Sequence, residues 1–182
     1  IFAKTCGAVC IETHENNLTP DLDVMLAAVT DKTRIVFLTN PNNPTGSFNT
    51  PAQIKKFRDS LREDILLILD DAYAEYAAAT PGYENGFALA KNSSNIVVLR
   101  TFSKIFGLAG LRLGYGYCPD QIADVLNRVR GPFNVSVPAQ VAGIAALGDD
   151  DFIERSVAHN TQWRVWTVKE LSSNRLKVWP SA

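Results

Sequence analysis

The chain has 182 residues, of which 46% are hydrophobic and 20% are charged, and its formal net charge at pH 7 is −1. This composition is that of a globular protein with one sizeable core, and the near-neutral charge argues against general nucleic-acid binding. No apolar stretch approaches the length of a membrane span, so we expect neither a membrane protein nor a secretory signal. Three cysteines, a small and odd number, fit free thiols and a cytoplasmic protein.

The beginning of the chain is expected to form a strand over residues 7–12. Alternate residues of a strand lie on one face, so Cys6, Cys10 and His14 would face the same way. Three ligands at this spacing match no known zinc module. We therefore expect no metal site in this segment.

A helix and a buried strand are predicted next. Thr19 and Pro20 are typical of the cap and first turn of a helix. Residues 34–39 are apolar on both faces, which predicts a strand of a parallel sheet. The helix is expected to pack on that sheet through four side chains at helical spacing: Leu22, Met25, Leu26 and Val29.

The motif Asn-Pro-Asn-Asn-Pro-Thr-Gly, at residues 40–46, follows that strand. Its prolines keep the preceding asparagines out of the helical region, which predicts a rigid turn that holds side-chain amides at a fixed position. A generic surface turn has a similar composition. Thr50 and Gln53 then match a capping box and predict a helix. Its inward side chains are expected to be Ile54, Phe57 and Leu61.

Two adjacent acids, Asp70 and Asp71, follow the next buried strand at residues 65–69. Carboxylates at such a position are costly to bury unless a positive group meets them. Tyr73 lies two residues further on, so that the segment ends in Leu-Asp-Asp-Ala-Tyr. We expect these polar side chains to face a ligand.

A third buried strand, at residues 96–99, leads into a loop that contains hydroxyls, glycines and Lys104. A loop of this composition can hold an anionic group and offer it an amine. A Gly-x-Gly at Gly114 and Gly116 lacks the third glycine of a dinucleotide fingerprint, and no helix pattern follows it. The polar residues of the loop are Thr101, Ser103, Lys104 and Arg112.

The alternation of buried strands and amphipathic helices predicts an α/β fold, with a mostly parallel sheet sandwiched by helices. In such sheets ligands bind at the carboxyl ends of the strands. Asn43, Asp70 and Lys104 each follow one predicted strand. We therefore expect them to meet at one edge of the sheet.

The last third of the chain is predicted to be mainly helical. Pro119 is expected to open a helix that residues 131–134 break, and short and long helices follow at 138–147 and 150–172. A strand is expected at 175–179. In the first of these helices, four side chains are expected to face the interior of the protein: Ile122, Val125, Leu126 and Val129. On the long helix we expect structural roles for His159, Trp163 and Trp166.

The three motifs NPNNPTG, LDDAY and RTFSKIFGLAGLRLGYG, in this order and spacing, resemble the fold type I aminotransferases that use pyridoxal 5'-phosphate. The resemblance covers nearly the whole chain. It is strongest to the histidinol-phosphate aminotransferases, which share the segments found here at residues 132–140 and 159–164. It implies a partial large domain at 1–172 and the truncated start of a small domain at 173–182. Since the chain begins at Ile1, we expect it to be part of a longer polypeptide.

The resemblance also implies site roles. Lys104 would bind the cofactor aldehyde and move protons, and partial burial would lower the pKa of its amine. Asp70 would hold a proton on the ring nitrogen, while Asn43 and Tyr73 would bind the ring oxygen. Asp71 stands where many members carry glutamate, and we expect little consequence. The phosphate would be held by Thr101, Ser103 and Arg112.

The implied reaction is transamination between histidinol phosphate and 2-oxoglutarate, in histidine biosynthesis. An aromatic amino acid aminotransferase, or another fold type I enzyme such as a decarboxylase, remains open. A non-catalytic binding protein would be expected to have lost Lys104 or Asp70, and both are present. The family builds each site from two subunits, so we expect a homodimer with Asn134 near the neighbouring site.

Overall fold

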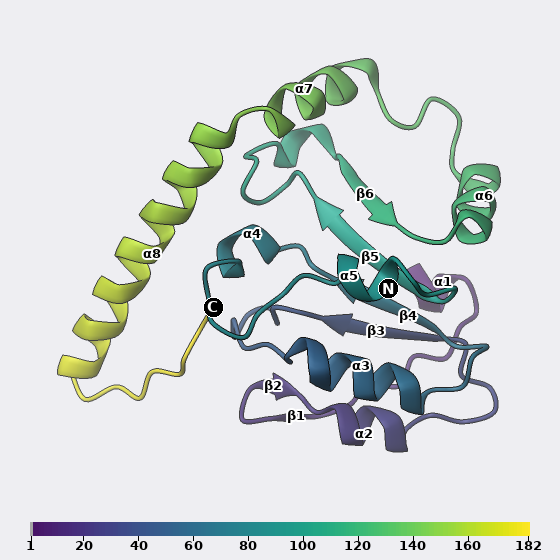
Figure 1. Cartoon of the computed structure of the whole chain (residues 1–182), viewed down its shortest axis with the longest axis horizontal. Helices are drawn as coiled ribbons and strands as arrows, with labels where there is room; N and C mark the ends of the chain where they lie inside the picture. The colour runs from purple at the N-terminus through teal and green to yellow at the C-terminus, as the bar shows by residue number, and fades with distance from the viewer. Residues whose placement is uncertain (1) are drawn as a thin grey trace.

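The computed structural model describes residues 2–182 and is built around a four-stranded sheet in the order β3-β4-β5-β6 (Figure 1). The strands β3 (Ile35–Thr39), β4 (Leu66–Asp70) and β5 (Ile96–Thr101) are parallel. The last strand, β6 (Gly114–Tyr117), is antiparallel to β5. The predicted mostly parallel α/β sheet is confirmed.

Helices flank this sheet and extend beyond it (Figure 1). The long helix α8 (Asp150–Ser173) runs down one side of the molecule, and α7 (Val137–Leu147) precedes it. A separate two-stranded sheet pairs β1 (Glu15–Asn16) with β2 (Thr19–Pro20). The remaining helices are α1 (Phe2–Thr5), α2 (Leu22–Ala27), α3 (Pro51–Ser60), α4 (Ala74–Ala77), α5 (Phe87–Ala90), α6 (Asp120–Val129) and the 3-10 helix η1 (Ala109–Leu111).

The main core lies between the central strands and α3. Leu67 and Leu69 of β4 are fully buried, and Ile54 and Phe57 of α3 pack in the same cluster. The predicted capping box is confirmed, since the Thr50 side chain accepts from the Gln53 N–H and the Gln53 side chain accepts from the Thr50 N–H. The four side chains predicted to pack on the sheet also contact this cluster: Leu22, Met25 and Leu26 from α2, and Val29, which lies just after the helix. Burial of these side chains fixes the sheet from which the site projects.

Two N-terminal predictions are wrong. Residues 7–12 form no strand, because no strand in the described part of the chain pairs with them, and they are mostly exposed. The cap of α2 is Asp21 rather than Thr19: its Oδ1 accepts from the N–H groups of Asp23 and Val24 at 3.0 and 3.1 Å. Thr19 is in β2 instead. Among residues 2–182, no cluster of three His, Cys, Asp or Glu side chains is arranged to hold a metal.

Two predictions about burial are also wrong. The helix α6 forms after Pro119 as expected, but Val125, Leu126 and Val129 are exposed, because no described element packs on that face. The edge strand β3 was predicted to be buried on both faces, yet Ile35 and Phe37 are exposed. Leu38 of the same strand is buried in the core, so the strand is covered on one face.

The end of the chain departs from the prediction as well. The helix α8 and the edge-on packing of Trp163 against Trp166, with ring centroids 5.5 Å apart, agree with expectation. Residues 175–179 are not a strand, because they run beside no strand of the described chain and lack a ladder partner. The segment returns toward the loop after β3, where the Ala182 N–H donates to the Gly46 carbonyl at 2.9 Å.

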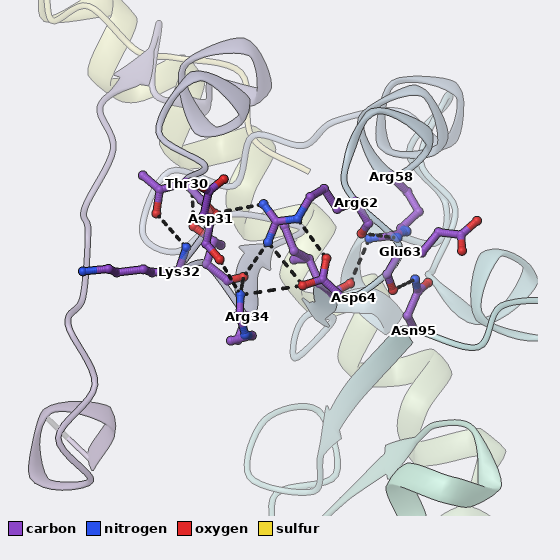
Figure 2. A network of polar contacts seen from close by, with 11 residues as sticks. Thr30, Asp31, Lys32, Arg34, Arg58, Arg62, Glu63, Asp64 and Asn95 are labelled. Carbon is purple, nitrogen blue, oxygen red and sulfur yellow. Dashed lines mark hydrogen bonds and ion pairs between the residues drawn. The ribbon is translucent and has the colours of Figure 1, made fainter.

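Polar contacts hold the amino ends of the three parallel strands together (Figure 2). Arg62 donates to the carbonyls of Thr30 and Thr33 at 2.9 and 3.1 Å and pairs with Asp64 at 2.9 Å. Asn95, just before β5, donates to the Glu63 carbonyl at 2.8 Å. These bonds fix the edge of the sheet opposite to the one where the predicted ligand-binding residues lie. No helix among residues 2–182 is both long enough and apolar enough to cross a membrane.

Candidate active site

The loop after β3 uses its asparagines in different ways. Asn40 is buried, and its Oδ1 accepts from the Asn49 N–H at 2.7 Å while its Nδ2 donates to the Asn49 carbonyl. Asn42 is buried too, and donates to Glu15 and Thr45 at 2.7 and 2.9 Å. These two side chains fix the loop from within. Asn43 is left exposed, as a site residue requires, and donates from Nδ2 to the Tyr73 hydroxyl at 2.9 Å.

The two acids after β4 have opposite environments. Asp70 is half-buried, and its Oδ1 accepts from the Ala72 N–H at 3.1 Å. Asp71 is 1% exposed, and its Oδ2 accepts from the Gly86 N–H at 2.6 Å. Burial raises the pKa of Asp71 to about 7. Asp70 is therefore the carboxylate available to a ligand, and Asp71 belongs to the interior.

Lys104 lies beside Tyr73, with its Nζ 5.1 Å from the centre of the phenol ring. The expectation that partial burial lowers the pKa of this amine is wrong, because Lys104 is exposed. Its pKa is raised, chiefly by a side-chain hydrogen bond with Tyr73 and to a smaller extent by the charge of Asp70. Asp70 is the last residue of β4 and Lys104 lies three residues after the end of β5, so both lie at the carboxyl ends of neighbouring parallel strands.

A second cluster follows β5 and can receive an anion. The Thr101 Oγ1 accepts from the Ser103 N–H at 3.0 Å, which tightens the turn. Arg112 has a left-handed backbone, with φ of 52°, and its Nη1 lies 3.4 Å from the Ser103 Oγ and 2.7 Å from the Ala109 carbonyl. The guanidinium is exposed at this turn and keeps further donors for a ligand. Two hydroxyls and a guanidinium form the kind of cup that suits a phosphate.

The seven predicted site residues thus fall into two adjoining groups. Asn43, Asp70, Tyr73 and Lys104 meet beyond the ends of β3, β4 and β5, and Ser103 links Lys104 to the cup formed with Thr101 and Arg112. This arrangement offers, side by side, an amine, a carboxylate, a phenol with an amide, and an anion cup.

Sequence reasoning missed a buried ion pair behind the site. Arg100 of β5 pairs with Glu75 of α4, with side chains 8% and 16% exposed, and the guanidinium lies 5.3 Å from the centre of the Phe87 ring. A signal was present, because Arg100 is a charged residue in an otherwise apolar strand. A cavity of about 840 Å³ lies elsewhere, along α8 and the end of the chain. None of the seven predicted site residues lines this cavity.

Comparisons with known proteins agree on one family. A model of the family described as aminotransferase class I and II matches residues 2–182. The histidinol-phosphate aminotransferase of Rhodospirillum rubrum is 50% identical over 182 residues, which cover 100% of this chain and 49% of the relative. That of Paramagnetospirillum magneticum is 47% identical over 181 residues, covering 100% and 50%. The chain spans about half the length of the curated relatives it matches.

A solved structure gives the same result in three dimensions. The histidinol-phosphate aminotransferase from Sinorhizobium meliloti, crystallised in complex with pyridoxal-5'-phosphate, is 31% identical and superposes with a TM-score of 0.84. The match covers 92% of this chain and 45% of that chain.

Proposed function

Because this chain belongs to the class I and II aminotransferases, we propose that it binds pyridoxal 5'-phosphate and acts in transamination between an amino donor and a 2-oxo acid. Its fold is that of the fold type I enzymes, with a mostly parallel sheet flanked by helices. The observation that carries the proposal is the grouping of Asn43, Asp70, Tyr73 and Lys104 at the carboxyl ends of the strands. This group adjoins the hydroxyl and guanidinium donors that can bind a phosphate.

The donor set fits the chemical groups of this cofactor. Bound pyridoxal 5'-phosphate supplies an aldehyde that reacts with amines and a ring that accepts electrons. Thr101, Ser103 and Arg112 would hold the phosphate, with the guanidinium donating two hydrogen bonds. Asp70 would keep a proton on the ring nitrogen, since an opposite charge favours the protonated form.

Lys104 has two tasks in this proposal. Its exposed amine would take the aldehyde, which requires loss of the proton that Tyr73 and Asp70 help it hold. Released by the substrate amine, Lys104 would act as general base and acid at the substrate α-carbon. Asn43 holds the Tyr73 hydroxyl in place at 2.9 Å, so both side chains would bind the ring oxygen.

Borohydride labelling tests the proposal. The purified protein is incubated with pyridoxal 5'-phosphate, reduced, digested and mapped, and the pyridoxyl label is expected on Lys104. Lys91, which is also exposed, is the internal control. Label on Lys91, or no stable label at all, contradicts the assignment.

We propose histidinol phosphate as the amino donor and 2-oxoglutarate as the acceptor. The support is the sequence identity of this chain, 47% and 50% over its whole length, to two curated histidinol-phosphate aminotransferases. The test compares kcat/KM for histidinol phosphate, histidinol and phenylalanine in one assay. A dedicated site should favour the phosphorylated donor by at least ~10²-fold, because phosphate-binding groups left without their anion are costly. Preference for phenylalanine would instead assign an aromatic aminotransferase.

We also propose that the protein works as a homodimer in the cytoplasm. A stripe of apolar side chains on α7, namely Val137, Val141 and Ile144, is between 64% and 75% exposed, and Phe133 beside it is 97% exposed. Such a stripe is typical of a protein interface, and Asn134 lies close to this stripe in the sequence.

The proposed compartment is supported by the three free cysteines, which fit a reducing environment. We assign residues 1–172 to the large domain and 173–182 to the start of a small one, close to the end of α8.

A further inference from the structure

A layer of buried polar groups lies behind the turn that joins β4 to α4. We propose that Asp71 is a positioning residue of the site: by accepting the Gly86 N–H at 2.6 Å, it fixes the turn on which Asp70 and Tyr73 are placed. This inference rests on the proposed function, since it concerns the same cofactor site. Asp71 itself is 1% exposed and touches no ligand, so its effect must pass through the turn.

The turn is held between neighbouring segments by Asp71. Its N–H donates to the Leu99 carbonyl of β5 at 3.0 Å, and its carbonyl accepts from the Ala74 N–H of α4 at 3.1 Å. The side chain adds a third link, to Gly86 at the start of α5. A shift of this residue therefore moves Asp70 on one side and Tyr73 on the other.

Gly86 can reach Asp71 because it has no side chain. A Cβ at this position would lie 2.7 Å from the Leu69 Cδ1 and 2.9 Å from the Val98 Cγ2, both closer than carbon atoms pack. The close approach brings the Gly86 N–H into a nearly dry space, where a donor without an acceptor is costly. The layer needs an acceptor at residue 71.

The charges around Asp71 indicate that its main role is to accept the hydrogen bond from Gly86, and that its negative charge matters less. The titratable groups that face it are Asp70, Glu75, Tyr83 and Arg100. Arg100, the cation of this set, is already paired with Glu75. A second carboxylate charge would thus have no full partner, and burial raises the pKa of Asp71 to about 7. An amide, which accepts without charge, should replace this carboxyl well.

Two variants separate the acceptor from the charge. Asp71→Asn keeps an oxygen for Gly86, whereas Asp71→Leu has a similar shape and no acceptor. Absorbance titration of the cofactor-free protein with pyridoxal 5'-phosphate should give a dissociation constant within about twofold of wild type for Asp71→Asn, and at least about tenfold weaker for Asp71→Leu. The pH midpoint of the bound cofactor's visible band should move only in Asp71→Leu.

A control variant removes side-chain hydrogen bonds far from the site. Asn95→Ala removes the exposed 2.8 Å bond to the Glu63 carbonyl at the opposite edge of the sheet (Figure 2), together with the 2.9 Å bond that Asn95 Oδ1 accepts from the Ser93 hydroxyl. It is expected to lower thermal stability without changing the affinity for the cofactor or the pH midpoint. A general loss of stability would therefore not imitate the effect of Asp71→Leu.

The outcomes are distinct. If wild type binds no pyridoxal 5'-phosphate, the proposed function fails and this inference fails with it. If wild type binds, but Asp71→Leu has the same affinity and midpoint, only the inference is overturned. Should Asp71→Leu not fold, amide exchange of Gly86 in wild type decides: cofactor binding should slow it about tenfold, and unchanged exchange overturns the inference.

Discussion

Asp70 and Asp71 are the same residue type, one position apart, with different surroundings. Asp70 is half-buried at the end of β4, and its Oδ1 accepts from the Ala72 N–H at 3.1 Å. Asp71 is turned into the interior toward Gly86. Exchanging each for asparagine preserves size and an acceptor oxygen, so the pair of variants measures what the charge does at each place.

We predict that Asp70→Asn lowers kcat by several orders of magnitude, because the proton on the cofactor ring loses its carboxylate partner. The same exchange at Asp71 should cost far less, since the Gly86 N–H keeps its acceptor. Steady-state kinetics of both variants under saturating substrates make the comparison. Equal losses at the two positions would show that Asp70 has no special role.

The raised pKa of Asp71 predicts a pH dependence of stability. Between its ordinary value near 4 and about 7, the folded protein keeps the Asp71 proton while the unfolded chain loses it. The folded state then binds more protons, so this carboxyl lowers the free energy of unfolding as pH rises, by at most roughly 4 kcal/mol in total. Above about pH 7 the effect levels off. Urea unfolding of wild type and Asp71→Asn across this range should give diverging curves, and parallel curves would refute the assignment.

At the level of residues, the sequence was sufficient where a polar motif follows a buried strand. Asn43, Asp70 and Lys104 lie at the predicted edge because parallel strands bring their carboxyl ends together. The pKa of Lys104 was predicted in the wrong direction, since its exposure and its bond to Tyr73 depend on tertiary structure. The pairing of Arg100 with Glu75 joins residues far apart in sequence, and no local pattern specifies such a partner.

At the level of elements, local signals predicted helix and strand better than they predicted burial. The capping box of α3 lies entirely within residues 50–53, and it formed as predicted. The α6 pattern predicted a helix correctly but not its environment, because periodicity identifies an apolar face without identifying what covers it. The strand predicted at residues 7–12 is wrong for a related reason, because a β-strand is stable only when it pairs with a neighbouring strand.

At the level of the whole molecule, the exposed stripe on α7 predicts the assembly state. We expect wild type to sediment as a dimer and Ile144→Asp to dissociate at least about 100-fold more readily, because a charge would be buried in an apolar interface. Val165 on α8 is similarly exposed but lies outside the stripe, so the control variant Val165→Asp should remain dimeric. An active wild-type monomer, or equal effects of the two variants, would rule out this interface.

The order of the strands in the sheet has a consequence for how the chain folds during synthesis. Strands β3, β4, β5 and β6 lie side by side in the order in which the ribosome makes them. Each pairing of parallel neighbours closes a segment on the order of thirty residues, and none of the four described strands has to insert between two that are already paired. During synthesis, each new strand can therefore add to the same edge of the growing sheet. Asn43 is placed first and Arg112 last, so the phosphate cup is completed only after the carboxylate and the phenol are already in position.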